Sequence, residues 1–350
     1  MDILKDSLDY RSSGVDIAAG EKAVTAIKHK VKATYNSNVL SELGSFGGLY
    51  QIDKSSWQNP ILVSSTDGVG TKLLVAILAN EYKTIGQDLV NHCVNDILVQ
   101  GAIPQFFLDY IGLGKLIPAR VEDIIEGMVV ACKQNSCALI GGEMAEMPGI
   151  YKEKDFDLVG TIVGIVEREQ LLPRAKMKPG DKLIALPSSG LHTNGYSLVR
   201  KIVFEKLNLS LDTYIPDCET TLGELLLRVH RSYLPLLKDY LTDPSLLGLA
   251  HITGGGIAGN LKRILPDNVS AIINLKETDI PPFFKWLQEA GKVDFSIMKE
   301  TFNLGIGMLC VVDHKMQDKY LSIPEARCVG ELVPSDYIQE KIEFDLCGAK

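Results

Sequence analysis

The chain has 350 residues, of which 46% are hydrophobic and 23% charged, and its formal net charge is −8. This composition is typical of a globular protein, and the length suggests about two domains. A net acidic chain without clusters of basic residues disfavours nucleic acids and anionic membranes as main partners. No apolar run approaches the roughly 20 residues of a membrane-spanning helix.

The cysteines favour a reducing compartment. They are odd in number, contain no C-x-x-C pair and lie at positions 93, 132, 137, 218, 310, 328 and 347. This pattern indicates free thiols and not a disulfide framework. The first residues are too polar for a secretory signal peptide. We therefore expect a cytoplasmic protein.

The first half of the sequence alternates helical and extended patterns. Ala23, Ile27 and Val31 recur at helical spacing, and a glycine-rich segment that contains Phe46 follows at residues 43–52. Apolar runs that end in glycine or polar residues then predict strands, and longer periodic segments predict helices. The strands are expected within residues 59–68, 103–114, 138–149 and 156–168, and the helices within residues 84–101 and 118–137.

A polar segment with two prolines and a P-G-D turn, residues 167–182, is typical of a domain boundary, which we place near residue 170. The second half then repeats the pattern. We expect a strand running into a loop within residues 182–195, a helix within 196–207, a glycine loop before a short helix within 249–266, and a buried strand within 301–313. Alternating strands and helices predict an α/β fold of α+β layers, with domains at residues 1–170 and 171–350.

Four acidic residues stand out by their surroundings: Asp67, Asp96, Asp109 and Glu143. Three of them, all except Asp96, are expected where a strand ends and a loop begins, a common location of ligand sites. Carboxylate oxygens suit Mg²⁺, which binds a few carboxylates together with substrate phosphates. A single acid near a glycine is usually a turn former or a helix cap, so only the recurrence of such acids favours a metal site.

The segment "TDGVGTK", residues 66–72, combines one of these acids with features of a phosphate site. Gly68 and Gly70 allow the backbone to approach a phosphate and present N–H groups to it, and Lys72 could neutralise phosphate charge. The segment is not a Walker A motif. An ordinary turn with a solvated lysine at the start of a helix explains the pattern as well, and both interpretations stay open.

Two loops in the second half have the composition of anion sites. Residues 188–195, "SSGLHTNG", come directly before a predicted helix, whose N-terminus attracts anions, although Thr193 or Asn194 could serve only as a cap. His192 could complete a phosphate pocket there. Residues 251–256, "HITGGG", form a second loop of small residues. An isolated histidine such as His251 is more often structural than functional.

Taken together, the motifs resemble the aminoimidazole ribonucleotide synthetase family over about residues 8 to 332. The shared motifs, in order, are "DYRSSGVDIAAG", "LGSFGG", "SSTDGVGTKL", "TIGQDLVNHCVNDILVQGA", "FFLDY", "GGEMAEMPG", "SSGLHTNGYSLVRK", "HITGGG" and "TFNLGIGM". The resemblance implies an ATP- and Mg²⁺-dependent cyclo-ligase of purine biosynthesis. Such an enzyme phosphorylates the formyl oxygen of formylglycinamidine ribonucleotide, closes the imidazole ring of aminoimidazole ribonucleotide, and releases ADP and phosphate.

The resemblance also implies roles for individual residues. It places catalysis at Asp67, Lys72, Glu143 and His192, and the metal at Asp67, Asp96 and Glu143. It places ATP at Lys28, at a lid formed by Gly44, Phe46, Gly47 and Gly48, and at Asp67, Gly68, Gly70 and Asp96. It places the substrate at Ser189, His192, Asn194, Gly195, Thr253, Gly254 and Gly255. Met144 stands where most members have threonine, so it cannot supply a hydroxyl there.

For the assembly, the resemblance implies a homodimer whose N-terminal sheets join into a barrel-like core, with a C-terminal sheet flanked by helices. A K⁺ requirement is compatible with it. Two other functions fit the loops less well: a small-molecule kinase with the same Asp–glycine loop, and a non-catalytic nucleotide-binding protein. The general base for ring closure is not identified by the sequence.

Overall fold

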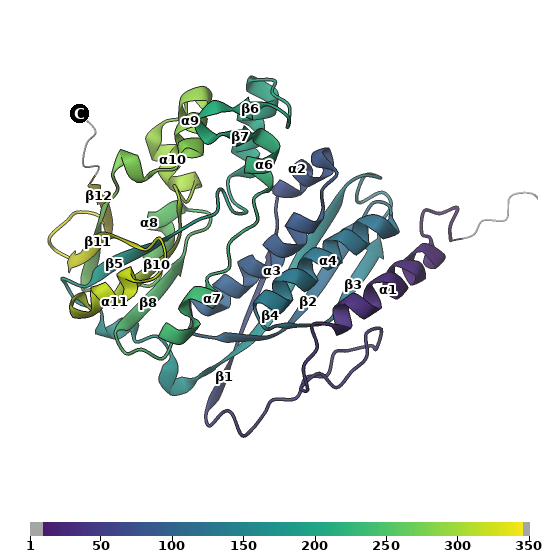
Figure 1. Cartoon of the computed structure of the whole chain (residues 1–350), viewed down its shortest axis with the longest axis horizontal. Coiled ribbons are helices and arrows are strands. Elements are labelled where there is room, and N and C mark those ends of the chain that lie inside the picture. Colours follow the sequence, from purple (N-terminus) through teal and green to yellow (C-terminus); the bar gives the residue numbers. More distant parts are fainter. Residues whose placement is uncertain (1–9, 346–350) are drawn as a thin grey trace, which may run out of the picture.

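The computed structural model describes residues 10–345. The polar start of the chain before Tyr10, and Cys347, lie outside the described residues. Within them the chain forms two larger sheets, each with helices packed against it (Figure 1).

The bounds of the regular elements follow the chain order. The helices are α1 (Ile17–Lys32), α2 (Lys72–Ala79), α3 (Lys83–Leu98), α4 (Pro118–Gln134), α5 (Tyr196–Arg200), α6 (Leu222–Leu227), α7 (Leu234–Leu237), α8 (Gly256–Leu261), α9 (Pro282–Gly291), α10 (Phe295–Thr301) and α11 (Gln317–Leu321). The strands are β1 (Pro60–Gly68), β2 (Ile103–Leu113), β3 (Ala138–Glu146), β4 (Phe156–Glu167), β5 (Lys182–Pro187), β6 (Tyr214–Ile215), β7 (Thr220–Thr221), β8 (Leu246–His251), β9 (Val269–Asn274), β10 (Ile306–Val312), β11 (Arg327–Pro334) and β12 (Ile342–Asp345).

The first sheet has the strand order β1-β4-β2-β3, and α1, α3 and α4 cover one of its faces (Figure 1). Strand β4 is antiparallel to β1 and β2, whereas β2 and β3 are parallel and α4 makes the crossover between them. Helix α1 buries the predicted stripe of Ala23, Ile27 and Val31. The opposite face of the sheet is open along β1, where Leu62 is 60% exposed and Thr66 is exposed as well.

The second sheet has the order β12-β9-β11-β5-β10-β8 and is antiparallel except for the β12–β9 pair. One apolar cluster runs from the first sheet to the second, because Leu89 and Phe107 belong to the same buried core as Leu186, Leu249 and Met308. A separate cluster fills the other side of the second sheet. We propose that the two sheets mark two domains, with the boundary near residue 170 between β4 and β5.

The structure confirms the strands and helices predicted within both halves, including the helix that contains Asp96, and corrects two details. Asp109 and Glu143 lie inside β2 and β3 and not at their ends, because residues 108–113 and 141–146 continue to pair in parallel. Asp96 lies in the last turn of α3. A helix that the sequence did not predict as a separate element, α2, begins at Lys72.

Candidate active site

Helix α3 buries a polar face at the junction of the two sheets. Asp88 and Asn95 are fully buried and Asn91 is 3% exposed, and their spacing places them on one side of the helix. Asn91 Nδ2 donates to the carbonyl oxygen of His230 at 2.8 Å, and Asn95 Nδ2 donates to that of Arg231 at 2.9 Å. The N–H of His230 in turn donates to Asp88 Oδ1 at 2.7 Å. This polar face therefore joins the first sheet layer to the segment between α6 and α7.

The same helix brings two of the predicted acids together. His92 Nε2 lies 2.9 Å from Asp67 Oδ2 at the end of β1, and 3.9 Å from Asp96 Oδ2 one turn further along α3. Ser65 Oγ donates to Asp96 Oδ2 at 3.1 Å, and His251 Nδ1 from the second sheet lies 2.9 Å from Asp96 Oδ1. Asp67 and Asp96 thus both face His92, and Asp96 also faces His251.

Both carboxyl groups have a lowered pKa. Burial raises the pKa of Asp67, but the hydrogen bond and charge of His92 outweigh burial. At Asp96 burial likewise raises the pKa, and His251 outweighs it. The two acids are therefore ionised at neutral pH and form an anionic pair suited to a cation.

Four histidines gather next to this pair. His92, His192, His230 and His251 are each at most 6% exposed. His230 Nε2 lies 3.0 Å from His251 Nε2, and the rings of His192 and His230 stack with centroids 3.9 Å apart. Thr193 Oγ1 lies 2.7 Å from His92 Nδ1 and 3.3 Å from His230 Nδ1. The cluster joins residues from four segments of the chain: α3, the loop before α5, the segment between α6 and α7, and the end of β8.

Sequence reasoning selected His192 and His251 but missed His92 and His230. The position of His92, one helical turn before Asp96, is a signal that could have selected it, since residues four apart share a helix face. His230 stands in a segment without any motif, and only the packing of that segment on α3 brings it to the site.

The loop before α5 positions His192. The residue has a φ of 62°, and the backbone N–H of Ser189 donates to its Nε2 at 3.2 Å. Burial lowers the pKa of His192 well below its ordinary value. The neutral ring therefore carries its proton on Nδ1, which is buried and has no hydrogen-bond partner among the described residues. Such an N–H group is suited to an acceptor on a ligand.

The two predicted anion loops lie side by side. Asn194 Oδ1 accepts from the N–H of Gly254 at 3.0 Å, so the loop before α5 contacts the loop before α8, which also contains Thr253 and Gly255. Gly195 has a φ of 80°, and a Cβ there would lie 2.3 Å from the ring of Phe302, so only glycine fits.

The Asp67 loop also reaches these segments. Strand β1 ends at Gly68. Two residues later, in the turn between β1 and α2, Gly70 has a φ of 69°. The hydroxyl oxygens of Thr71 and Ser197 are 3.0 Å apart. The structure thus gathers Asp67, Asp96 and the loops at residues 188–195 and 253–255 at the junction of the sheets.

Lys72 is buried at this junction. Its side chain is 0% exposed, and Nζ lies 2.7 Å from Asp88 Oδ2 and donates to the carbonyl oxygen of Arg228 at 2.7 Å. Burial lowers the pKa of Lys72, and Asp88 opposes that effect. The interpretation of Lys72 as a solvated lysine is wrong, because α2 packs against the second half of the chain. Its ammonium group is held by Asp88 and not directed at a phosphate.

Glu143 lies apart from the other two proposed metal acids. It is on β3, three strands from β1, in the cross-strand row Gly68–Val159–Tyr110–Glu143. At the usual strand spacing that row is about 14 Å long. Within one chain the structure therefore does not bring Glu143 to Asp67.

Glu143 instead lines a cavity of about 370 Å³ beneath α1, together with Asp109, Ile27 and Gly44. Burial, together with the nearby charge of Glu143, raises the pKa of Asp109 to about 7. A Cβ on Gly142 would lie 2.2 Å from Asp109 Oδ1, so this glycine leaves room for the acid.

The predicted lid lies beside this cavity and not beside Asp67. Phe46 is fully exposed, and a Cβ on Gly48 would lie 2.7 Å from Ile140 Cδ1 of β3. Gly47 and Lys28 are exposed too. In a single chain the lid and the paired acids are therefore separate.

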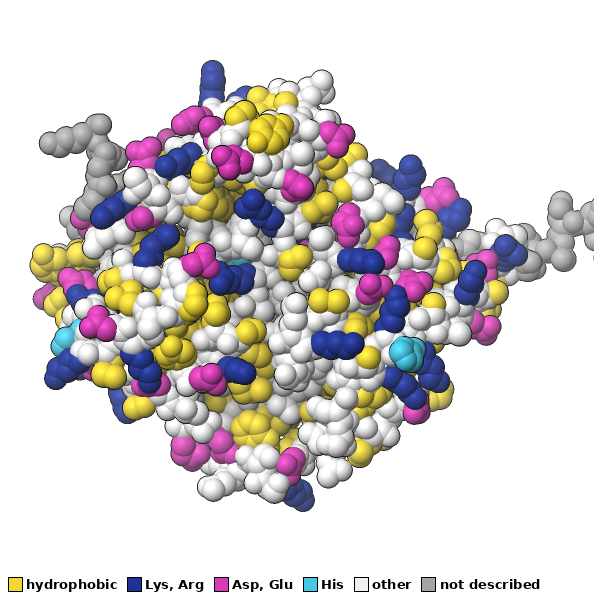
Figure 2. Space-filling model, in the orientation of Figure 1, with side chains coloured by type: hydrophobic (Ala, Val, Ile, Leu, Met, Phe, Trp, Pro, Cys, Tyr) yellow, Lys and Arg dark blue, Asp and Glu magenta, His cyan; other side chains and the backbone are white. Residues whose placement is uncertain are grey.

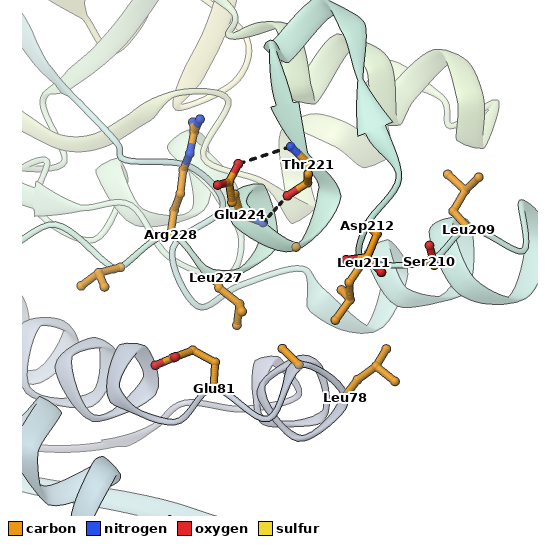
Figure 3. Close-up of a pocket in the computed structure, with 13 residues that line it drawn as sticks. Leu78, Glu81, Leu209, Ser210, Leu211, Asp212, Thr221, Glu224, Leu227 and Arg228 are labelled. Atoms are coloured by element: carbon orange, nitrogen blue, oxygen red, sulfur yellow. Dashed lines mark hydrogen bonds between the residues drawn. The ribbon is translucent and has the colours of Figure 1, made fainter.

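Two further cavities open at the junction. One of about 420 Å³ extends from Asp96 and His251 to Arg174 and Arg263. Another of about 940 Å³ lies between α2 and residues 209–229, and none of the predicted site residues line it. Figure 3 shows Leu211 and Leu227 of the second half pointing toward Leu78 and Glu81.

The surface seen in Figure 2 mixes the two signs of charge. Basic and acidic side chains alternate there with small apolar areas. None of the helices in the described part of the chain is both long and apolar enough to cross a membrane.

Comparison with known proteins identifies the family. Residues 52–166 match the N-terminal domain of the AIR synthase related proteins, and residues 178–341 match their C-terminal domain. A phosphoribosylformylglycinamidine cyclo-ligase from Alkaliphilus oremlandii is 45% identical over 331 residues, which cover 93% of this chain and 97% of the relative. One from Geobacter sulfurreducens is 46% identical over 345 residues, which cover 97% and 99%.

Solved structures support the fold. A thiamine-monophosphate kinase from Stenotrophomonas maltophilia has a TM-score of 0.64 at 18% identity and covers 91% of this chain and 96% of its own. The hydrogenase maturation protein HypE from E. coli has a TM-score of 0.63 at 16% identity, with 93% and 95% covered. HypE in complex with ATP has a TM-score of 0.62 at 17% identity, with 91% and 87% covered. By sequence and fold, the chain belongs to the AIR synthase family, that of the phosphoribosylformylglycinamidine cyclo-ligases.

Proposed function

We propose that this chain is an ATP-dependent cyclo-ligase that converts formylglycinamidine ribonucleotide to aminoimidazole ribonucleotide in purine biosynthesis. Its similarity to cyclo-ligases over nearly the whole chain carries the proposal. The formyl oxygen attacks the γ-phosphorus of ATP and ADP leaves. The amidine nitrogen then attacks the activated carbon, and the C–O bond breaks with release of inorganic phosphate and a proton. Such chemistry asks the protein mainly for positioning and charge stabilisation.

The paired acids are suited to a metal ion at the phosphates. Asp67 and Asp96 are ionised and lie on two sides of His92, and their carboxylate oxygens fit Mg²⁺, which would neutralise phosphate charge when bound. Glu143 belongs to the proposed metal and catalytic residues too, although it lines the cavity beneath α1. A K⁺ requirement remains part of the proposal without a residue assigned to it.

For ATP we propose the lid and the acids together. The exposed glycines leave the lid free to move, and Gly44 lines the same cavity as Glu143. Lys28, Gly47, Gly48 and the exposed ring of Phe46 then cover the nucleotide, while Gly68 and Gly70 offer backbone N–H groups near Asp67. Lys72 acts through its pairing with Asp88, as a positioning residue.

For the substrate we propose the joined loops. His192 supplies a neutral Nδ1–H donor without a partner, Ser189 and Asn194 hold the loop, and Gly195 allows its close packing. Thr253, Gly254 and Gly255 lie beside Asn194. Free backbone N–H groups before α5 favour the ribose phosphate as the group bound there.

A direct assay tests the function. Purified protein with formylglycinamidine ribonucleotide and Mg-ATP should form aminoimidazole ribonucleotide, ADP and phosphate in equal amounts. ADP release with no imidazole product would contradict the proposal. Phosphate retained on the organic product would support a kinase instead.

We propose a homodimer that forms through the open face of the first sheet, giving a barrel-like core. The cross-strand row Thr66–Thr161–Leu108 lies on this face, and Thr66 of strand β1 is exposed. Thr161→Arg should convert a dimer to monomers in analytical ultracentrifugation, because a charge would be buried there without a partner. The matched control Lys262→Arg, on the remote α8 side, should remain dimeric, and a monomeric wild type would refute the dimer.

We also propose that the substrate is a small molecule and that the protein works in the cytoplasm. We propose neither a nucleic acid nor a membrane as a partner. The described cysteines are all free, which suits a reducing compartment.

A further inference from the structure

Two carboxyl groups lie opposite each other at one end of the second sheet. Strands β5 and β10 are antiparallel, and Lys182 pairs with Val312 at the end of their shared ladder. This register places Asp181, the residue before β5, opposite Asp313, the residue after β10. Like charges in directly opposed positions destabilise a sheet. The pair therefore costs stability unless a cation lies between the two carboxylates.

Asp181 presents an unsatisfied oxygen to this position. Its side chain is 0% exposed, and the N–H of Lys178 donates to its Oδ2 at 2.9 Å, which fixes the orientation of the group. The other oxygen, Oδ1, is buried and has no hydrogen-bond partner among the described residues. Burial raises the pKa of this carboxyl group, and the charge of Asp313 adds to the rise. A buried acceptor is costly to leave without a partner, so Asp181 Oδ1 is suited to a ligand.

His314 faces both acids. Its Nδ1 lies 3.5 Å from Asp313 Oδ1 and 3.9 Å from Asp181 Oδ1. One potential ligand atom from each of the three residues lies within 4.8 Å of the other two. Bonds of about 2.0–2.1 Å to a tetrahedral ion place neighbouring ligand atoms roughly 3.3 Å apart. Because the imidazole is 41% exposed, it can turn to close the remaining gap without disturbing the core.

The basic side chains nearby leave this position free. Lys178 Nζ lies 3.4 Å from Asp313 Oδ2, the other oxygen of that carboxylate, and its side chain is 53% exposed. An exposed ion pair of this kind contributes little stability. Lys182 pairs with Glu331. In the described part of the chain, no ammonium group is hydrogen-bonded to Asp181 Oδ1.

We propose that Asp181, Asp313 and His314 bind a Zn²⁺ ion, with water as the fourth ligand. Zn²⁺ accepts carboxylate oxygen and imidazole nitrogen in tetrahedral sites. The ion would join the start of β5 to the end of β10. Strand β5 has six residues, and the loop that contains His192 follows its other end, so about 20 Å separates the two sites. The inference is independent of the proposed function.

Anomalous X-ray scattering at the zinc absorption edge tests the location directly. Crystals of the EDTA-treated full chain, soaked with Zn²⁺, should show an anomalous peak between the three side chains. This measurement uses the wild type, so it does not depend on any variant folding. The absence of a peak there, in crystals whose other zinc sites are filled, would overturn the inference.

Calorimetric titration with Zn²⁺ tests binding in solution. His314→Ala should bind one Zn²⁺ fewer per chain than the wild type, or bind it with a Kd at least about tenfold higher, because a direct ligand is lost. Its melting temperature should also rise less on addition of Zn²⁺. Ring closure with Mg-ATP should match the wild type, since the site is remote from the joined loops.

The matched control is His29→Ala, which removes another exposed imidazole and should bind Zn²⁺ like the wild type. Wild-type stoichiometry and Kd in folded His314→Ala would overturn the inference, and would mark a crystal peak as binding at crystal concentration only. Ring closure without this zinc site refutes the inference alone. Zinc bound at this site without ring closure refutes only the proposed function.

Discussion

At the residue scale, the site depends on acids whose partners are histidines. Asp67 and Asp96 each contact an imidazole at 2.9 Å, and Gly68 donates its N–H to Asp67 Oδ1 at 2.6 Å. Every carboxylate oxygen of the pair therefore has a partner, and the orientation of both groups is fixed before any ligand binds. A site oriented in advance stabilises charge without reorganisation during the reaction.

Asp67→Asn tests the role of this charge. The amide keeps the shape of the side chain but loses the negative charge that attracts the metal. We expect turnover to fall about a hundredfold or more, with little change in thermal stability. The control is Asp336→Asn in an exposed turn. Wild-type turnover in Asp67→Asn would show that the acid serves only the turn.

His192→Asn tests the donor at the joined loops. Asparagine tolerates the positive φ at this position, so the loop should keep its conformation. The KM for the ribonucleotide should rise about tenfold and that for ATP much less, because one hydrogen bond to a charged group is lost. Equal increases in both KM values, measured by steady-state kinetics, would argue against a separate ribose-phosphate site.

At the element scale, the first sheet has two acids in one cross-strand row, Asp67–Gly160–Asp109–Gly142. Gly160, the residue between them, carries no side chain on the helix side of the sheet. A Cβ on Gly160 would lie 2.2 Å from the ring of Phe107, which fills the space between the acids. The row therefore keeps Asp67 and Asp109 apart, in two separate environments.

Asp109→Asn should change how stability depends on pH. The pKa of Asp109 is about 7 in the folded chain, above its ordinary 3.8. The folded chain thus binds more protons than the unfolded chain between these values, and its free energy of unfolding falls as pH rises through that window. Denaturant unfolding should show the variant gaining roughly 4 kcal/mol on the wild type between pH 4 and 8. The control Asp123→Asn, on the solvent side of α4, should show no such gain. A pH-independent difference for Asp109→Asn would contradict the expectation.

The strands and helices could be predicted because apolar runs and helical spacing are local signals. The end of β3 could not, since Gly141 and Gly142 have the composition of a loop, yet the parallel pairing with β2 continues through them. His230 and the burial of Lys72 were also beyond sequence reasoning. Both depend on packing between segments more than 130 residues apart.

At the scale of the whole molecule, one ion pair lies where the two sheets meet. Lys72 and Asp88 are both 0% exposed, and each also bonds to the backbone of the segment at residues 228–230. A buried pair of this kind contributes little net stability but makes the loss of one partner costly. It therefore fixes how the halves join.

Asp88→Asn should lower the free energy of unfolding by about 3–5 kcal/mol, because it leaves the ammonium of Lys72 buried without a counter-charge. The double variant Lys72→Met/Asp88→Asn should recover most of the loss, since the asparagine oxygen can still accept from His230. Urea unfolding of both variants measures the difference. A double variant as unstable as the single one would show that packing, and not charge, is responsible.

The apolar core that continues from Leu89 and Phe107 to Leu186 and Met308 has a consequence for engineering. Neither half can be exchanged as an independent module, since cutting the chain between β4 and β5 would strip both fragments of part of their interior. A chimera with a relative's second half would have to match that interior and also supply the histidines opposite Asp96. Residues on either side of this seam should therefore change together as such proteins diverge.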